Sequence, residues 1–476
     1  MKKKENIAKY RATLPIYKCR KQIVDLIYNN QTVIIIGETG CGKSTQVPQF
    51  LVDSQEFRGC SIAITQPRRV SACSLAKRVS YERHCQMGRE VGYNVRFDNM
   101  SSSKTRIKYI TDGMLLREIL YDKELSSYDV VILDEIHERT VQTDLLIGLL
   151  RDLQKRRGPG NDSAKELKLV LMSATLHCQL FIDFFDNPPI IHVTGRMYNV
   201  SIFYVDKPES DYVDATAISV IQLNMDLDMP GDFLVFLTGQ EEIDELVNLL
   251  RSKATDPPLH VLPLYAALPL HLQQKVFDEA PEGHRKVILS TNIAETSVTI
   301  PGIKYVIDCG LVKVKSFNPI SGVECLGLLP IAKAQAMQRS GRAGRESEGA
   351  CFRLYTEDTF FELRDSPIAE IRRADLSSVV LQLFALGVDN PLKFKFLEQP
   401  PIKMLQSSLE TVYSLGAIDD NGKLTDDGLI MATFPLTPKM TKLLLLASKN
   451  ACGSQALTLL AMLSCENLFV NPSEGL

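Results

Sequence analysis

The sequence lacks any apolar run of about 18 residues, which is the length that a membrane-spanning helix needs. It also lacks an apolar segment near its N-terminus, so we expect no secretory signal. Its eleven cysteines include no C-x-x-C pair, and its seven histidines form no H-x-x-x-H pair. We therefore expect free thiols in a reducing, intracellular compartment, and neither a disulfide framework nor a zinc site.

The chain also has little net charge, −3 over 476 residues. Any nucleic-acid partner must therefore bind a local basic groove, because bulk charge does not attract it. The composition, 45% hydrophobic and 23% charged, is typical of a globular protein. The length suits two to four domains.

Short apolar runs alternate with helical patterns along most of the chain. The first series has predicted strands at 33–36, 61–65, 107–110, 129–133 and 168–172, with predicted helices at 70–83, 112–120 and 141–155. A second series begins near residue 195, with predicted strands at 233–237, 259–263, 286–289 and 304–307. This α/β alternation predicts parallel sheets with helices on both faces and ligands at the carboxyl ends of the strands.

The two ends of the chain do not follow this alternation. Residues 1–17 are predicted to be a polar lead-in, and the pattern becomes mainly helical after about residue 360. Helices are predicted at 369–386, 402–415 and 454–464, and Asn421-Gly422 predicts a tight hairpin. The unit of two helices and a hairpin resembles a winged helix.

A glycine-rich loop follows the first predicted strand and fits the pattern G-x-x-x-x-G-K-[ST]. Its residues are Gly37, Glu38, Thr39, Gly40, Cys41, Gly42, Lys43, Ser44 and Thr45. Glycine lets backbone N–H groups converge on phosphate oxygens, and the helix start adds partial positive charge. In this pattern Lys43 reaches the β- and γ-phosphates, and the Ser44 hydroxyl binds Mg²⁺. We favour this interpretation over a strand–turn–helix linker that happens to contain glycines.

Two carboxylates, Asp134 and Glu135, follow the buried strand predicted at 129–133. A parallel sheet presents its ligands at this end of its strands. We expect Asp134 and Glu135 to hold Mg²⁺ together with Ser44, and Glu135 to polarise the attacking water. A strand that simply ends in charged residues is the alternative, which the upstream phosphate loop disfavours.

Asp134-Glu135-Ile136-His137 resembles motif II of the DEAH-box RNA helicases, as a D-E-x-H variant. The other motifs of that family follow in order along the chain. They correspond to Thr65–Val70, Thr111–Leu115, Ser173–Thr175, Phe236–Ile243, Thr291–Ser297 and Gln338–Arg345. Each motif is weak alone, but the ordered set is highly specific.

The resemblance implies two tandem RecA-like P-loop domains, then a winged-helix domain and part of a helical ratchet domain. The expected boundaries are 1–17 for an N-terminal extension, 18–192 and 193–360 for the RecA-like domains, 361–433 for the winged helix and 434–476 for the ratchet. The family continues into an OB-fold, which we expect to be absent from this chain. We therefore expect ATP hydrolysis to survive while RNA stimulation and unwinding weaken.

Arg342 and Arg345 have the i, i+3 spacing that places two side chains on one helical face. An arginine finger on the γ-phosphate is worth roughly 10³–10⁵ in rate. Because these arginines lie in the second series, the nucleotide must sit between the two RecA-like domains. The resemblance implies catalytic roles for Gln338, which positions water, and for His137.

The resemblance further implies that Arg78 and Phe277 stack on either side of the base, so that ATP and other nucleotides are accepted. A surface arginine and a core phenylalanine are the alternatives.

Ser173 and Thr175 correspond to the motif that couples hydrolysis to movement. Family positions expected to touch RNA are Arg68, Arg69, Arg96, Thr111, Thr291 and Asn292. Backbone-directed contacts predict poor sequence specificity, and a solvated turn cation is the alternative for Arg96.

Two residues depart from the family pattern. Pro301 stands where an acidic residue is common, which removes an expected ribose contact. Cys41 replaces the usual serine, and this should be harmless because its backbone N–H binds phosphate. The segment 312–323 resembles the family's hairpin near the RNA exit.

We expect an ATP- and Mg²⁺-dependent RNA helicase that translocates 3′ to 5′ and remodels RNA or ribonucleoprotein. One alternative is a truncated product that binds nucleotide and RNA without unwinding; another is a DNA-directed motor. The resemblance suggests a monomer without membrane contact, a G-patch-type activator or ribonucleoprotein partner, and a nuclear or nucleolar location, with the cytoplasm as the alternative.

Overall fold

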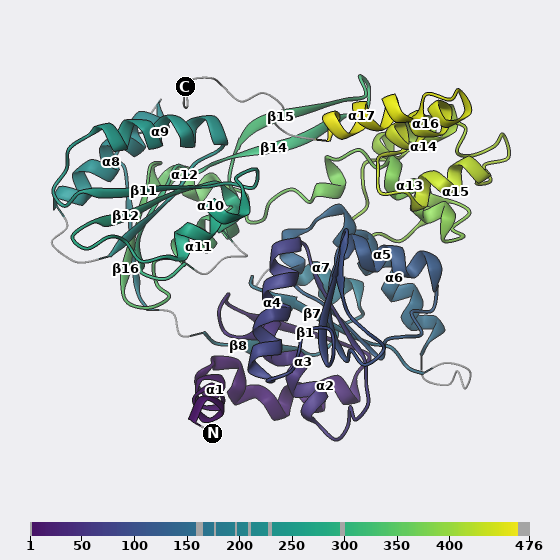
Figure 1. Cartoon of the computed structure of the whole chain (residues 1–476), viewed down its shortest axis with the longest axis horizontal. Coiled ribbons are helices and arrows are strands. Elements are labelled where there is room, and N and C mark those ends of the chain that lie inside the picture. The colour runs from purple at the N-terminus through teal and green to yellow at the C-terminus, as the bar shows by residue number, and fades with distance from the viewer. Residues whose placement is uncertain are drawn as a thin grey trace.

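The computed structural model describes residues 2–158, 165–175, 178–195, 198–207, 211–226, 231–295 and 300–464 (Figure 1). The end of the motif at 291–297 and the last residues of the predicted ratchet lie outside these ranges. A surface loop, which Gly158-Pro159-Gly160 in the segment 156–166 predicts, also lies mostly outside them. Within them, no helix is both long and apolar enough to span a bilayer.

The first domain is built on a sheet that, in the described residues, has eight strands in the order β4-β3-β5-β2-β6-β7-β1-β8. The strands are β1 Thr32–Gly37, β2 Ile62–Gln66, β3 Val91–Val95, β4 Asp98–Met100, β5 Ile107–Thr111, β6 Val130–Leu133, β7 Lys168–Ser173 and β8 Ile190–Val193. The five predicted strands are confirmed as β1, β2, β5, β6 and β7. The sequence did not predict β3, β4 and β8, and the β3–β4 pair is antiparallel.

Helices cover both faces of this sheet, and the side chains of its strands alternate between two separate cores. Ile34 packs into one core, whereas its neighbour Ile35 packs into the other. One core is closed by helices α2 Arg20–Asn29, α3 Lys43–Asp53 and α4 Arg69–Glu82. The opposite core is closed by helices α5 Asp112–Tyr121, α6 Val141–Arg156 and α7 Gln179–Phe184. The three helices predicted in this domain correspond to α4, α5 and α6.

The N-terminal segment differs from the prediction of a polar lead-in. It forms helix α1 Lys2–Thr13 and a 3₁₀ turn at Pro15–Cys19. Ile16 in this turn is fully buried and its backbone N–H donates to the Cys41 carbonyl at 3.2 Å. The sequence did not indicate helix α1, because it contacts the first domain through long polar side chains and so has no apolar periodicity.

The second domain has, among the described residues, a six-stranded parallel sheet in the order β11-β12-β10-β13-β16-β9. Its strands are β9 Val200–Tyr204, β10 Asp232–Phe236, β11 Leu259–Leu264, β12 Arg285–Ser290, β13 Ile303–Asp308 and β16 Gly349–Arg353. Its helices are α8 Tyr212–Asp226, α9 Gln240–Ser252, α10 Leu270–Gln274, α11 Lys333–Ser340 and α12 Glu357–Glu362. The four predicted strands are confirmed as β10 to β13, while β9 and β16 were missed.

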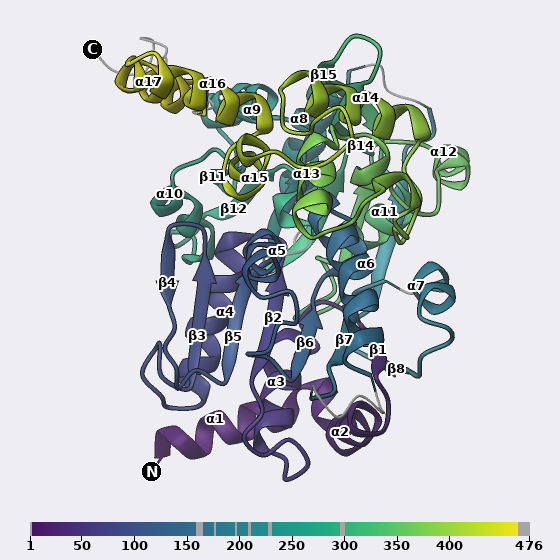
Figure 2. The same ribbon diagram turned by 90° about the vertical axis from the view of Figure 1, so that its right-hand side faces the viewer.

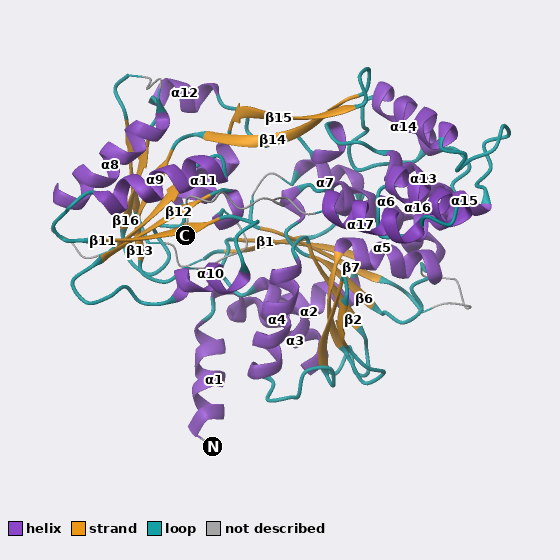
Figure 3. Cartoon of the chain, turned by 45° about the horizontal axis from the view of Figure 1, so that its top comes forward, coloured by secondary structure: helices purple, strands orange, loops and turns teal. Residues whose placement is uncertain are grey.

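A long antiparallel hairpin leaves the second domain and reaches the C-terminal helices, as the orange strands of Figure 3 show. It consists of β14 Leu311–Asn318 and β15 Val323–Pro330, which contains the segment at 312–323. Ser407 donates to the Pro319 carbonyl at the hairpin tip at 3.1 Å, and Arg373 donates to the Lys315 carbonyl at 2.8 Å. The hairpin therefore bridges two domains.

The C-terminal region consists mainly of helices. They are α13 Ser377–Ala385, α14 Ile402–Ser414, α15 Asp426–Thr433, α16 Pro438–Lys449 and α17 Gly453–Leu463. The helix predicted at 369–386 is wrong at its start, where Glu370–Arg372 forms a separate 3₁₀ turn. The Glu370 carboxylate accepts from the Val141 N–H at 3.0 Å, so this turn is bound to the first domain. The predicted hairpin at Asn421-Gly422 is only a turn with an isolated bridge between Ile418 and Leu424.

The C-terminal region and the first domain share one apolar core. Ile371 and Val380 belong to the same buried cluster as Leu146 and Leu150 of α6. Figure 2 shows α13 lying above α5 and α6. This shared core holds the C-terminal helices on the first domain, whereas the second domain reaches them through its hairpin.

Candidate active site

The glycine-rich loop lies between the fully buried strand β1 and helix α3. Gly40 and Gly42 have φ of +89° and +100°, the left-handed region that favours glycine. Lys43 is buried, and its ammonium donates to the carbonyls of Gly37 and Glu38, the latter at 3.1 Å. The loop thus concentrates backbone N–H groups and one buried cation at the start of a helix, which is the arrangement that binds phosphate.

The remaining loop residues lie around this cradle. Tyr109 donates to the Ser44 carbonyl at 2.7 Å, and Thr45 Oγ1 donates to the Gly42 carbonyl at 3.3 Å, so the first turn of α3 is fixed. The Cys41 side chain is buried, and burial raises the pKa of its thiol. Thr39 lies in the turn between Glu38 and Gly40.

Asp134 and Glu135 stand directly after β6, both buried. Asp134 Oδ2 accepts from Gln66 Nε2 at 2.5 Å, and Asp134 Oδ1 accepts from the Glu135 N–H at 2.9 Å. Burial, and then the charge of Glu135, raise the pKa of Asp134 to about 6, against hydrogen bonding from Ser44 and Gln66. The structure therefore brings the loop hydroxyl next to the first carboxylate.

Glu135 is held in the left-handed region, with φ of 54°. Burial raises the pKa of this carboxyl, while the nearby positive charges of Lys43 and Arg342 lower it. Its Oε2 atom is buried without a hydrogen-bond donor in the described part of the chain. A buried carboxylate oxygen without a donor, beside a second carboxylate and a hydroxyl, fits the oxygen ligands that Mg²⁺ takes.

His137 lies beside Glu135 and is neutral. Burial lowers the pKa of this imidazole to about 4. Its Nδ1 accepts from the Ala174 N–H at 3.3 Å, so the 3.5 Å approach of Nδ1 to Glu135 Oε2 is not an ion pair. His137 therefore connects the carboxylates to the segment Ser173–Thr175, where the Thr175 N–H donates to Ser173 Oγ at 3.1 Å.

The second domain supplies the facing wall of the site. Arg342 and Arg345 follow helix α11, and Arg342 donates to the Glu295 carbonyl. Burial and the charge of Arg345 lower the pKa of Arg342, whereas Glu135 raises it. Burial also lowers the pKa of Arg345, to about 10, and Glu135 again opposes this. Both arginines therefore lie within electrostatic reach of Glu135, across the boundary between the domains.

A cavity of about 950 Å³ opens beside this wall, between the two domains and the hairpin. The first domain contributes Arg68, His137 and Thr175 to its lining, and the second contributes Asn292 and Gln338. The polar and charged side chains in its lining, and its position next to the carboxylates, suit a polar strand that lies close to the hydrolysis site.

Arg68, which lines this cavity, makes polar contacts with residues of both domains. It donates to the Ile293 carbonyl of the second domain at 3.2 Å and pairs with Glu138 at 3.6 Å. The neighbouring Arg69 is exposed at the start of α4. In this structure Arg68 is thus a bridge between domains, and its contact with RNA stays a prediction.

The other residues predicted to touch RNA occupy three places. Thr111 ends β5, and Thr291 and Asn292 follow β12, at the carboxyl ends of parallel strands. Arg96 is exposed, donates to the Pro435 carbonyl and lies over the Phe97 ring at 4.9 Å. It is therefore a contact between the first domain and the C-terminal region as well as a candidate for RNA.

The two residues predicted to stack on the base stand on different domains. Arg78 projects from α4, where its Nε donates to Glu82 Oε1 at 2.7 Å. Phe277 is 45% exposed in a 3₁₀ turn of the second domain, which is unusual for a phenylalanine that serves the core. Their stacking on a base stays a prediction.

Two residues that support the site, Arg339 and Gln66, were not predicted from the sequence. Arg339 lies inside the predicted Gln338–Arg345 motif, yet it is fully buried and pairs with Glu295 at 3.1 Å and with Asp308 at 2.7 Å. It fixes the position of the turn that carries the arginines. Gln66, which orients Asp134, lies in the segment at 65–70, and no local pattern revealed this role.

Family comparisons agree with this geometry. Residues 17–181 match the sequence model of the DEAD/DEAH box helicases, and residues 216–347 match the helicase conserved C-terminal domain. Residues 408–436 match the winged-helix part of the helicase associated domain (HA2), and residues 437–475 match its ratchet-like part.

Individual relatives are similar over nearly the whole chain. The mouse ATP-dependent RNA helicase DHX33 is 46% identical over 98% of this chain and 68% of its own length. The human probable ATP-dependent RNA helicase DHX35 is 45% identical over 98% of this chain and 68% of its own. The Arabidopsis thaliana pre-mRNA-splicing factor ATP-dependent RNA helicase DEAH10 is 44% identical over 99% and 71%.

A solved structure shows the same fold. The crystal structure of the Escherichia coli DEAH/RHA helicase HrpB superimposes with a TM-score of 0.87 and 32% sequence identity. The superposition covers 96% of this chain and 57% of that one.

Proposed function

The chain belongs to the DEAH-box family of ATP-dependent RNA helicases, and we propose that it couples Mg²⁺-dependent ATP hydrolysis to 3′-to-5′ movement along RNA. The comparisons favour this function over the alternative of a product that only binds. The observation that supports the mechanism is that Glu135, which lies beside Lys43 and Asp134, meets Arg342 and Arg345 across the domain boundary.

The site divides the chemistry between its two walls. Ser44, Asp134 and Glu135 are the residues that would hold Mg²⁺, which supplies charge neutralisation at the phosphates when bound. Lys43 binds the β- and γ-phosphates from the first domain. Glu135 orients the attacking water and accepts its proton; burial raises the pKa of this carboxyl and so makes it a stronger base.

The second domain completes the site only when the domains lie together. Gln338 positions the water from the cavity side, and Arg342 and Arg345 stabilise the charge that develops on the γ-phosphate. Loss of the γ-phosphate removes the charge that both arginines bind. The two domains are then less strongly attracted, and this change drives the movement along the strand.

His137 provides a route from hydrolysis to the strand. It lies between the carboxylates and Ser173–Thr175, and it lines the cavity together with Arg68 and Asn292. Because these groups are few and polar, we expect contact with the phosphate–sugar backbone and little sequence preference. RNA in a nuclear or nucleolar ribonucleoprotein is the proposed substrate, and a G-patch-type protein is a candidate activator.

The Glu135→Gln variant tests this function. Removal of the base should lower ATP turnover by about 10²–10⁴ while nucleotide binding persists, because the amide keeps the shape of the carboxylate. Turnover should be measured with and without single-stranded RNA, and unwinding on 3′-tailed and 5′-tailed duplexes of RNA and of DNA. Wild-type turnover in the variant would refute the mechanism, and unwinding only of 5′-tailed duplexes would refute the direction.

A further inference from the structure

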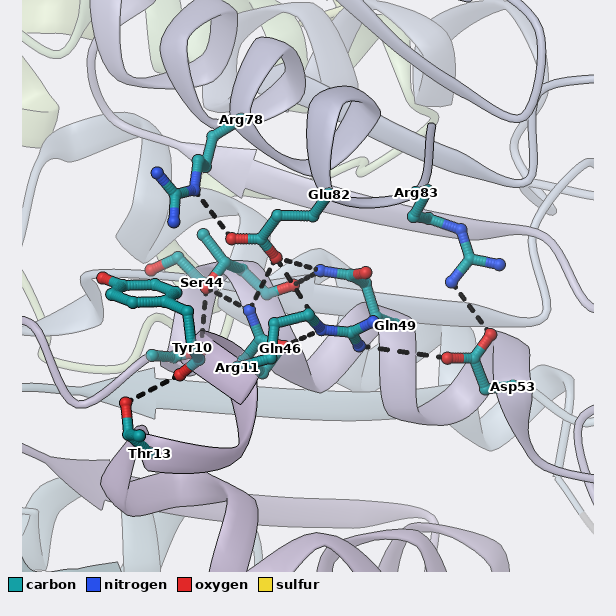
Figure 4. Close-up of polar contacts among 12 residues, drawn as sticks. Tyr10, Arg11, Thr13, Ser44, Gln46, Gln49, Asp53, Arg78, Glu82 and Arg83 are labelled. Carbon is teal, nitrogen blue, oxygen red and sulfur yellow. Dashed lines mark hydrogen bonds and ion pairs between the residues drawn. The ribbon is translucent and has the colours of Figure 1, made fainter. Parts of the chain in front are cut away.

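The N-terminal segment Tyr10–Ile16 lies against the nucleotide site, although none of its residues is needed for the mechanism above. Figure 4 shows its polar side chains meeting those of α3 and α4. These two helices carry the phosphate loop and Arg78. The segment therefore contacts the first domain at the elements that bind the nucleotide.

Arg11 holds this segment in place. Its Nε donates to Gln46 Oε1 at 2.8 Å, and its guanidinium lies 3.9 Å from the carboxylates of both Asp53 and Glu82. The Arg11 side chain is only 18% exposed, so these contacts are largely shielded from water. Glu82 also accepts from Gln46 and Gln49, which links Arg11 to a buried network between α3 and α4.

Leu14 and Ile16 add an apolar anchor. The Ile16 N–H donates to the Cys41 carbonyl at 3.2 Å. A Cβ at Gly42 would lie 3.1 Å from both the Leu14 and Ile16 side chains, so the segment packs directly on the phosphate loop. Two independent sets of contacts thus fix the end of α1 relative to the loop.

Tyr10 makes the contact that bears on nucleotide binding. The Arg78 guanidinium lies over the Tyr10 ring, 5.0 Å from its centroid. Arg78 is therefore held by Glu82 through its Nε and by the face of the Tyr10 ring. A planar guanidinium can also stack on another flat group, and 46% of the Arg78 side chain stays exposed for such a contact.

We propose that Tyr10 is a positioning residue for the nucleotide base, and that it orients Arg78 so that the base stacks on the opposite face of the guanidinium. This inference rests on the proposed role of Arg78 in base stacking. Arg11 supports the same arrangement, because it holds α1 where Tyr10 contacts Arg78. Stacking uses the flat face of any base, so these contacts strengthen nucleotide binding without selecting among nucleotides.

Nucleotide affinities of the full chain test this inference. A fluorescent ADP analogue is displaced by ATP, by GTP and by inorganic tripolyphosphate, which has no base. Tyr10→Ala should weaken ATP and GTP about two- to fivefold, the range of an exposed cation–π contact, and leave tripolyphosphate unchanged. Tyr10→Phe keeps the ring and should bind like the wild type. Arg11→Ala should reproduce the Tyr10→Ala result, and the double variant should be no weaker than either.

Three outcomes would overturn the inference. Tighter ATP binding by Tyr10→Ala would mean that the ring competes with the base. An equal loss for tripolyphosphate would mean that the segment only supports the phosphate loop. Unchanged ATP affinity in Tyr10→Ala would refute the positioning role if Arg78→Ala lowers the ATP affinity. If Arg78→Ala also leaves the ATP affinity unchanged, the proposed base site itself is wrong. The Glu135→Gln test of hydrolysis is independent of both results. Because Tyr10 is 51% exposed, its replacement should not prevent folding.

Discussion

Arg139 Nη2 lies 3.1 Å from Glu398 Oε2, and this ion pair joins the loop after the catalytic carboxylate to the segment before helix α14. Arg139 also pairs with the fully buried Asp144 through two 2.8 Å hydrogen bonds. Arg372 binds the other oxygen of Glu398 at 3.0 Å. The C-terminal region is therefore bonded to the loop that carries Glu135 and His137, as well as sharing a core with the first domain.

We predict that Glu398→Gln weakens the effect of RNA on hydrolysis. The variant loses two partly exposed charge pairs, to Arg139 and to Arg372, each worth up to about 1 kcal/mol, so stimulation by single-stranded RNA should fall severalfold while turnover without RNA is retained. Steady-state ATP turnover over a range of RNA concentrations measures this. Glu124→Gln is the control, because Glu124 pairs with Arg156 at the surface, away from the loop. Equal stimulation in both variants would show that the Arg139–Glu398 pair does not transmit the signal.

Arg342→Lys should lower the ATP turnover number by about 10³ or more. Lysine keeps the positive charge but loses the planar fork, and its shorter reach from the second domain places that charge away from the γ-phosphate. Binding of a fluorescent ADP should change little, because Lys43 and the loop bind the other phosphates. A turnover number within threefold of the wild type would contradict the assignment of Arg342 as an arginine finger.

Asp112 makes the stability of the first domain depend on pH. Burial raises the pKa of this carboxyl from 3.8 to about 6, against a hydrogen bond from Thr143. Between these values the folded state binds more protons than the unfolded state, so the contribution of Asp112 to stability falls as pH rises. About two pKa units correspond to about 3 kcal/mol lost by pH 7.

The Asp112→Asn variant should remove this dependence, because the amide oxygen still accepts from Thr143 and carries no charge. Urea unfolding of variant and wild type at pH 4 and pH 7.5 measures it. The free energy of unfolding of the variant should increase relative to that of the wild type as pH rises between these values. A constant difference in stability between the two proteins at both pH values would disprove the prediction.

Gly148 of α6 packs against the segment before helix α14. A Cβ there would lie 2.7 Å from the Phe394 ring and 3.0 Å from the Lys395 carbonyl. Gly148→Ala should therefore destabilise the protein by about 1–3 kcal/mol, the usual cost of overpacking, seen as a lower Tm. Gly327→Ala is the control, since a Cβ at Gly327 meets nothing within 4 Å. An equal Tm for both variants would mean that the interface adjusts freely.

The sequence was sufficient to predict strands and site residues wherever a short segment contains both the buried strand and the polar groups that follow it. The buried runs of β1 and β6 are continuous, and each is followed at once by the polar groups that the chemistry needs. Strands β9 and β16 were missed because their alternation is weak, and β3 was missed because Gly92 and Asn94 interrupt its apolar pattern. A carbonyl of the neighbouring strand β4 lies too close to Gly92 to admit a Cβ, a requirement that only pairing reveals.

The amino-acid sequence by itself determined the two α/β domains, the phosphate loop and the order of the catalytic motifs, because backbone geometry and side-chain type along short segments encode them. Only the tertiary structure decided which polar groups meet: Tyr10 with Arg78, Arg68 with the Ile293 carbonyl, and Arg139 with Glu398. Each of these contacts joins residues far apart along the chain, and long charged side chains leave no periodic signal. Their partners are chosen by the packing of whole domains.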